Sequence, residues 1–182
     1  MFRQVLTENE EKIFISLWEE ACIEKGYEME PFNSDSSLYL ILNNKDNPIG
    51  TLECIPYLGR LENELFCFQL LDLVKRDPSK VFIIDKVCLT KKERGANIRK
   101  VFDAIYNYSK LNNYSYGIAL LEPNFYRSLK IFYKLPINRV TEEKLFYKGD
   151  YVVPSIIDIE MVKGNFLKYE WMFNNVELNY VR

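Results

Sequence analysis

The chain has 182 residues, a formal net charge of −2 and a sequence pI of about 5.4. Its hydrophobic content of 48%, with 15% aromatic residues, suffices for a substantial core and excludes a largely disordered protein. Because the charge balance leaves no basic footprint, we do not expect nucleic acid as a main partner. The sequence has no histidine, so any proton transfer must use Asp, Glu, Tyr, Cys, Lys or water.

The cysteines and the N-terminus indicate the cellular environment. Cys22, Cys54, Cys67 and Cys88 lie far apart, and with no C-x-x-C and no histidine we expect free thiols in a reducing compartment rather than a zinc site. The first 20 residues are too acidic for a signal peptide, and no apolar run approaches the roughly 20 residues that a membrane span needs. We therefore expect a cytoplasmic protein that does not bind membranes.

The N-terminal half is predicted to form a helix and a hairpin. Thr7-Glu8-Asn9-Glu10 is a capping-box pattern, apolar residues then recur at helical spacing, and Gly26 provides a stop. Strands are predicted at 38–42 and 48–57, with a turn cluster at 43–47 between them. A further helix is predicted at 61–74, ended by residues 76–79.

The C-terminal half alternates strands and helices. The pattern predicts, in order, a strand at 81–89, a helix at 98–109, a doubly buried strand at 115–121, a helix at 125–134 capped by Asn124, and strand-like runs at 144–152 and 155–162. The aromatic extension 164–182 is left without an assigned element and is a candidate dimerisation surface. We expect one α/β domain over residues 1–163 and a possible homodimer.

The segment between the strand at 81–89 and the next helix is basic. Backbone N–H groups at a helix start, surrounded by cations, suit a pyrophosphate. The residues that would form this site are Arg94, Gly95, Ala96, Asn97, Ile98 and Arg99, with Lys100 as a further cation. The alternative is that Thr90 to Glu93 is a capping box with a solvated basic first turn. The strand and helix that follow favour the phosphate site.

The order of these motifs resembles the GNAT N-acyltransferase superfamily. The carrying residues are Asn124 followed by Tyr133, with Leu135-Pro136 in place of the usual closing pair, and Arg94-Gly95 within a [QR]-x-x-G-x-[GA] pattern. The two later small positions of that pattern fall here on Asn97 and Arg99, and bulky side chains hinder close approach to phosphate. The resemblance implies an α/β (α+β) fold: a mixed, mainly antiparallel sheet flanked by helices, with a V-shaped cofactor groove.

The resemblance also implies roles for single residues. Acetyl-CoA or another acyl-CoA would be the cofactor, bound by the residues at 94–99, by Asn124, and by the backbone of a bulged strand at Val87, Cys88 and Leu89. Tyr133 would protonate the departing thiolate, and Glu53, Asp85 or a water chain would deprotonate the amine, with Glu122 as a comparable candidate. Each has a simpler alternative: Glu53 as a solvent-facing strand residue, Asp85 in an ion pair with Lys86 or an arginine, and Tyr133 as an amphipathic core tyrosine.

Three functions are compatible with these residues. The resemblance implies most simply an acetyl transfer from acetyl-CoA to a small-molecule or peptide amine. Autoinducer synthases and N-acyl amino acid synthases share the architecture, lack the glycine-rich loop and carry longer acyl groups, which suits the weakened glycine pattern and the many aromatic residues. A wide apolar tunnel beside the sheet would distinguish this alternative. The third is a non-catalytic protein of the same fold that binds a ligand or partner.

Overall fold

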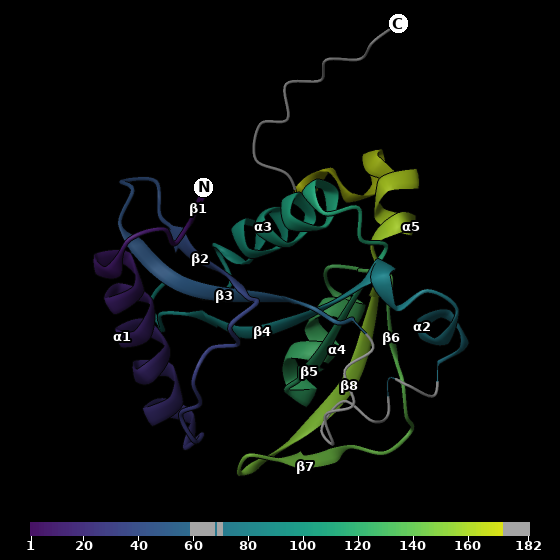
Figure 1. Cartoon of the computed structure of the whole chain (residues 1–182), viewed down its shortest axis with the longest axis horizontal. Helices are drawn as coiled ribbons and strands as arrows, with labels where there is room; N and C mark the ends of the chain where they lie inside the picture. The colour runs from purple at the N-terminus through teal and green to yellow at the C-terminus, as the bar shows by residue number, and fades with distance from the viewer. Residues whose placement is uncertain (59–67, 69–70, 173–182) are drawn as a thin grey trace, which may run out of the picture.

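A mixed β-sheet forms the centre of the computed structural model, which describes residues 1–58, 68 and 71–172 (Figure 1). Its strands lie in the order β1 (Phe2–Gln4), β2 (Ser37–Leu42), β3 (Pro48–Pro56), β4 (Val81–Leu89), β5 (Tyr116–Leu121), β8 (Asp150–Asp158) and β6 (Ile137–Arg139), and β7 (Leu145–Tyr147) pairs with β8. Within the described chain the β4–β5 pair is parallel and the other pairs are antiparallel. The expected mixed, mainly antiparallel sheet is confirmed.

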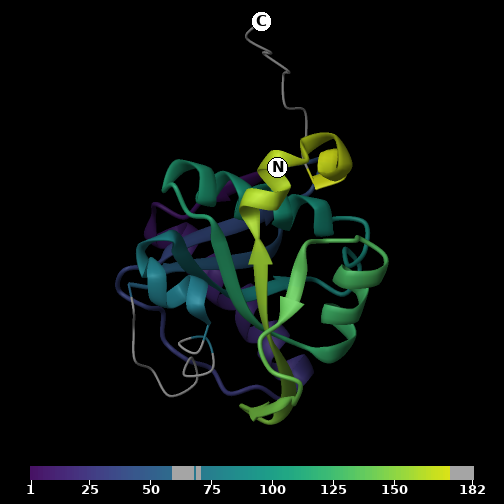
Figure 2. The same ribbon diagram turned by 90° about the vertical axis from the view of Figure 1, so that its right-hand side faces the viewer.

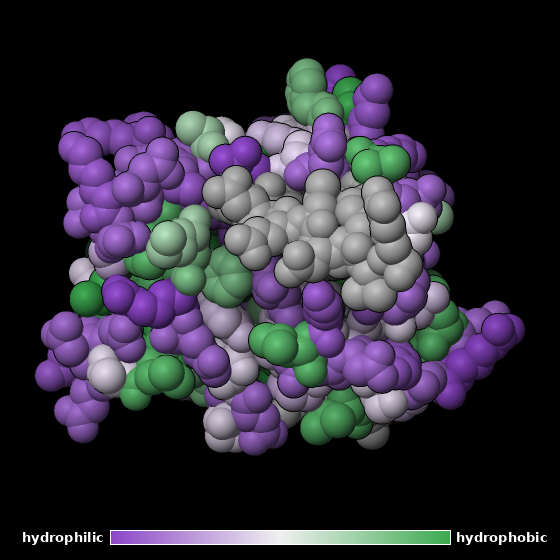
Figure 3. Space-filling model, turned by 90° about the horizontal axis from the view of Figure 1, so that it is seen from above, coloured by the Kyte–Doolittle hydropathy of each residue, from purple (hydrophilic) through white to green (hydrophobic). Residues whose placement is uncertain are grey.

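Helices cover both faces of this sheet (Figures 1 and 2). They are α1 (Glu8–Lys25), α2 (Asp72–Arg76), α3 (Ile98–Leu111), α4 (Pro123–Ile131) and α5 (Ile159–Gly164), with 3-10 turns η2 (Pro78–Lys80) and η3 (Phe166–Met172). Leu40 of β2 packs with Phe14 of α1, whereas its neighbour Tyr39 packs with Tyr108 of α3. Since successive strand residues point to opposite faces, α1 and α3 lie on opposite sides of the sheet. Seen from the side of α3 and α5, the surface is mostly hydrophilic with separate hydrophobic residues (Figure 3).

The ends of α1 follow the sequence prediction. The Thr7 hydroxyl oxygen accepts a hydrogen bond from the Glu10 backbone N–H at 3.3 Å, and Glu10 accepts one from the Leu6 N–H at 3.1 Å. Gly26 ends the helix with φ of 72°, a left-handed conformation that glycine adopts without steric cost. The hairpin of β2 and β3 and the helix α3 also lie where the pattern predicts them.

Two predictions around α4 and β8 are wrong. Pro123 occupies the first turn of α4 with Glu122 at the N-cap, so Asn124 is an exposed residue inside the first turn and not the cap. The expected strand at 155–162 ends at Asp158, because the Asp158 carboxylate accepts the Met161 N–H at 2.8 Å and starts α5. Short polar side chains favour such caps, and the apolar residues that follow were misread as strand.

The aromatic extension joins the main core in its described part. Tyr169 and Met172 of η3 are buried there, and the Trp171 ring packs against the rings of Phe102 on α3 and Tyr133. Residues 173–182 lie outside the described residues, as does most of the helix expected at 61–74, of which α2 shows the last turn.

Three of the four cysteines can be described, and all three are free thiols: Cys22, Cys54 and Cys88. Cys67 lies outside the described residues. Among the helices that the structure describes, none combines the length and the apolar character needed to cross a bilayer.

Candidate functional site

The sheet opens between its two parallel strands. Paired residues of β4 and β5 run from Val81 with Tyr116 to Ile83 with Ile118, after which β4 continues to Leu89 and β5 to Leu121 along separate paths. Beyond that point each strand pairs with its outer neighbour, β4 with β3 and β5 with β8. The opening of the predicted V-shaped groove is therefore present.

A bulge in β4 lies at this opening. Thr51 of β3 pairs with Cys88, and Glu53 pairs with Asp85, so Lys86 and Val87 together oppose the single residue between them on β3. Lys86 has φ of 44°, a left-handed conformation that costs a non-glycine residue about 1–2 kcal/mol. The Thr51 hydroxyl donates a hydrogen bond to the Lys86 carbonyl at 2.6 Å and thereby supports the bulge.

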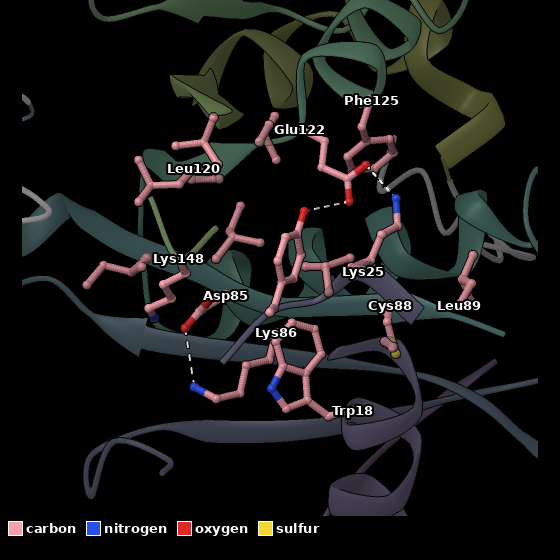
Figure 4. Close-up of a pocket in the computed structure, with 18 of the residues that line it drawn as sticks. Trp18, Lys25, Asp85, Lys86, Cys88, Leu89, Leu120, Glu122, Phe125 and Lys148 are labelled. Atoms are coloured by element: carbon pink, nitrogen blue, oxygen red, sulfur yellow. Dashed lines mark hydrogen bonds and ion pairs between the residues drawn. The ribbon is translucent and has the colours of Figure 1, made fainter. Parts of the chain in front are cut away.

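A cavity of about 1070 Å³ occupies the opening (Figure 4). Its walls include Ile84, Ala119 and Leu121, which belong to the core beneath α3. They also include Ile55, Ile83 and Leu120, which belong to the core on the opposite face, beneath α2. Since residues of both faces line one cavity, it passes through the sheet between β4 and β5.

A charged cluster lies at the bulge where α1, β3 and β4 meet. The Lys86 ammonium donates a hydrogen bond to Glu53 at 2.5 Å and lies 3.3 Å from Asp85. Glu53 is fully buried and also accepts the Asn33 N–H at 3.1 Å, whereas the Asp85 side chain is 45% exposed and lines the cavity. Burial lowers the pKa of Lys86, but the carboxylates of Asp85 and Glu53 outweigh it and raise the pKa above its usual value, so the lysine stays charged.

This geometry separates the two carboxylates proposed as bases. Glu53 is not the solvent-facing strand residue of the simpler alternative, because it is buried against Lys86. Asp85 forms the ion pair with Lys86 that was considered for it, yet it still faces the cavity. Of the two, Asp85 is the one placed to meet a bound molecule.

The basic segment forms the other end of the cavity. Turns cover residues 91–96 before α3 begins, and Arg94, Gly95 and Ile98 line the cavity. The Arg94 guanidinium donates two hydrogen bonds to Glu24 of α1, at 2.7 and 2.6 Å. Lys100 is buried and donates to the Leu42 carbonyl, so it points away from this corner.

Of the remaining residues predicted to bind the cofactor, some line the cavity and others lie outside it. Val87, Cys88 and Leu89 of the bulged strand line the cavity. Ala96 and Arg99 are exposed, and the Asn97 amide donates to Glu93 at 2.6 Å instead of capping α3. Asn124 is exposed and its carbonyl accepts a hydrogen bond from Ser128, outside the residues that line the cavity.

The end of α1 and the segment after it line the cavity and contact residues of the second half of the sheet. Glu122, at the end of β5, accepts hydrogen bonds from Lys25 at 2.8 Å and from the Tyr27 hydroxyl at 3.0 Å (Figure 4). Farther along, Glu30 forms an ion pair with Lys148 in the turn between β7 and β8. Burial and the Glu122 carboxylate raise the pKa of Tyr27, so this phenol keeps its proton and serves as a donor.

Tyr133 lines the cavity from beyond the end of α4. The helix stops at Ile131, and the chain turns before Leu135, which is buried. The Tyr133 ring is packed against Trp171 with 5.0 Å between ring centroids. This places the predicted acid and the bulged strand on one cavity.

Three residues of this site were not found from the sequence. Lys86 was considered only as a partner of Asp85, and its burial depends on a bulge that has no side-chain signature. Lys148 and Trp171 reach the site from segments far away in the sequence. A lysine inside an apolar strand is costly to bury without a partner, and that was the available signal for Lys86.

Comparison with known proteins agrees with this geometry. No family model matches the sequence, and no curated protein matches it. Among solved structures, FeeM, an N-acyl amino acid synthase from uncultured soil microbes, is similar over 95% of this chain and 98% of its own, with a TM-score of 0.73 and 12% identity. The fold is that of the GNAT acyltransferases.

Two CoA-dependent acyl-homoserine lactone synthases share this GNAT fold. MesI covers 94% of this chain and 93% of its own, with a TM-score of 0.64 and 12% identity. BjaI, in a structure with SAM and isopentyl-CoA, is similar over 88% of this chain and 78% of its own, with a TM-score of 0.64 and 12% identity. At these identities the likeness establishes the fold.

Proposed function

We propose that this protein is an N-acyltransferase that moves a medium or long acyl group from a thioester donor, an acyl-CoA, to a small-molecule amine. The observation that carries the proposal is the cavity through the sheet, because it joins the start of α3 at Gly95 and Ile98 to an apolar compartment on the other face. Its volume of about 1070 Å³ lies at the upper end of small-molecule sites. An acetyl group would leave the apolar compartment empty, whereas a longer chain would fill it.

The donor would enter from the α3 side. Its diphosphate would lie against the backbone at the start of α3, where helix N–H groups favour an anion, and the exposed Arg99 would add charge. Its pantetheine arm would follow Val87, Cys88 and Leu89, whose regular pairing the bulge interrupts. The thioester carbonyl would then lie at the opening, with backbone N–H groups of the bulge to stabilise its oxyanion.

The acyl chain would continue between β4 and β5. Ile55, Ile83 and Leu120 form the apolar wall there, and Val152 closes it from β8. Each methylene buried adds about 0.8 kcal/mol, so the site would favour longer donors until the compartment is full.

The transfer itself needs three proton movements. The acceptor ammonium would lie against Asp85 and lose its first proton to that carboxylate or to water. The free amine would attack the thioester carbon and form the C–N bond, and the nitrogen would lose its second proton to water as the C–S bond breaks. Tyr133 would give its proton to the departing thiolate and regain one from solvent. Much of the rate would come from holding both substrates in line.

A donor series tests this proposal. The purified full chain would be assayed for thiol release with acetyl-, hexanoyl-, octanoyl-, decanoyl- and dodecanoyl-CoA against a panel of amines, with products identified by mass. We expect a kcat/KM that rises with chain length and exceeds that for acetyl-CoA by at least about tenfold, or 1.4 kcal/mol. A kcat/KM for acetyl-CoA that equals or exceeds that for the longer donors would indicate an acetyltransferase instead. No turnover and no thermal stabilisation by any CoA thioester would reject the donor altogether.

A further inference from the structure

The charges around the cavity carry information about the acceptor. Among the described lining residues the cations are Lys25, Lys86, Arg94 and Lys148. Every one of them is ion-paired with a carboxylate of the protein: Lys25 with Glu122, Lys86 with Glu53, Arg94 with Glu24, and Lys148 with Glu30. A carboxylate at hydrogen-bond distance cancels most of the attraction that such a cation exerts on a ligand.

The negative charges at the same site are not fully balanced. Lys86 is shared by Glu53 at 2.5 Å and Asp85 at 3.3 Å, so this group of three carries a net charge of −1. Glu53 is fully buried and does not line the cavity. The excess negative charge therefore faces the cavity through Asp85, whose side chain is 45% exposed. Glu28 adds a further carboxylate to the lining.

We infer that the acceptor is an amine that carries no carboxylate. Its ammonium would bind Asp85, and no described lining cation is left to receive a ligand carboxylate, which would instead face Asp85 and Glu30. This inference rests on the proposed function and narrows its acceptor class. It sets the chain apart from a structural neighbour described as an N-acyl amino acid synthase, despite the shared fold.

The position of Lys148 makes the inference specific. This lysine lines the cavity in the turn between β7 and β8, and Glu30 from the segment after α1 holds it. Removing the Glu30 charge would free one ammonium at the acceptor end of the cavity. The same lysine would then be able to bind a carboxylate.

Matched acceptor pairs provide the test. Tyramine with tyrosine, phenethylamine with phenylalanine, and agmatine with arginine differ by one carboxylate, and kcat/KM would be compared within each pair with the best acyl-CoA donor. We expect the amine to be used better in every pair, by about tenfold, which is 1.4 kcal/mol. A pair in which the amino acid is used equally well or better would overturn the inference while leaving the acyltransferase proposal standing.

A variant tests whether the ion pair of Glu30 with Lys148 causes this acceptor preference. Glu30→Gln is expected to raise the use of amino acids relative to amines by about tenfold, or 1.4 kcal/mol. Glu160→Gln is the matched control, because Glu160 pairs with Lys163 on α5 outside the cavity lining, and it should leave the ratio unchanged. An unchanged ratio in Glu30→Gln would overturn the inference.

Absence of turnover with every acceptor would count against the proposed function, and the inference would then be decided by binding. The thermal shift of the full chain with each amine and its amino acid would be compared. Larger shifts with the amines support it, and equal or larger shifts with the amino acids overturn it.

Discussion

The two walls of the cavity are built in different ways. The β4 wall is polar and irregular: it carries a bulge, a residue with positive φ at Lys86, and a buried ion pair to Glu53. The β5 wall is apolar and regular, with Ala119 and Leu121 in unbroken register with β8. A strand that leaves the regular ladder needs side chains to satisfy and hold its backbone, whereas a regular strand needs only packing.

The contrast between the β4 and β5 walls suits them to two different functions within one cavity. The irregular wall presents backbone groups and charge, which suits recognition of a polar thioester and an amine. The regular wall presents methyl groups, which suits an acyl chain. Changes in the first wall should therefore affect stability and chemistry together, while changes in the second should affect the choice of donor.

The largest effect is expected at the buried ion pair. Lys86→Met leaves Glu53 without its cation in a fully buried site, and breaking such a pair typically costs about 3–5 kcal/mol. Replacing both partners, as Lys86→Met with Glu53→Gln, should recover most of this loss. Chemical denaturation of the three proteins at neutral pH measures it, and a single variant as stable as the wild type would contradict the assignment.

The same pair gives a pH dependence with a definite sign. Because the pKa of Lys86 is raised in the folded protein, its stabilisation is fully present below the unfolded pKa and is lost as the pH rises through the raised value. The stability of the wild type relative to that of the double variant should stay constant from neutral pH to about pH 9 and fall only above about pH 10. Denaturation across that range checks it, and a difference that falls between pH 7 and 9 would show that Lys86 is not held charged.

The next effect is expected at Tyr133. Tyr133→Phe removes the hydroxyl but keeps the ring that packs on Trp171, so folding should persist while kcat falls about 100-fold or more. Tyr151→Phe is the matched control, since Tyr151 is exposed on β8 and packs against Phe146. Steady-state kinetics with the best donor measures both. An unchanged kcat in Tyr133→Phe would remove the phenol from the mechanism.

A smaller effect is expected on the apolar wall. Leu120→Phe narrows the compartment beneath α2 and should lower kcat/KM for the longest donors by about tenfold, the size of effect that a misfit of one or two methylenes has in an apolar pocket. Acetyl-CoA should be used as before. Leu111→Phe, on the exposed side of α3, controls for added aromatic surface. Equal losses for all donors would indicate that the acyl chain does not pass Leu120.

The smallest effect is expected where Thr51 supports the bulge. Thr51→Val removes the hydrogen bond to the Lys86 carbonyl, and a typical bond of this kind contributes about 1 kcal/mol. Thr7→Val provides a comparison at the exposed start of α1, away from the cavity. Thermal unfolding gives the stability change. A Thr51 variant that loses more activity than stability explains would show that the bulge itself is needed for turnover.

Local patterns predicted the elements that depend on local chemistry. Thr7, Glu10 and Gly26 define α1 through caps that involve residues a few positions apart, and the helical spacing of apolar residues in 98–109 predicted α3. The same reasoning failed at Asp158, where one capping side chain turns an apolar run from strand into helix. It failed at Asn124 because Pro123 already fits the first helical turn.

The site was predictable only in part. Tyr133, Asp85 and the strand at 87–89 line the cavity, and their roles stay predictions. Arg94 also lines the cavity but is paired with Glu24, and Asn124 lies on the surface. Ion pairs such as Lys148 with Glu30 join segments more than a hundred residues apart. No local pattern encodes such pairs, because they depend on how the whole chain packs.

The packing of Trp171 against Tyr133 has a consequence for handling the protein. The indole comes from the aromatic segment after α5 and backs the ring that we assign to proton donation. Replacing Trp171 by a small residue, with the buried Met172 kept in the core, should leave the sheet assembled but remove the ring that holds Tyr133 in place. Preparations altered at that point would look well folded and yet turn over slowly.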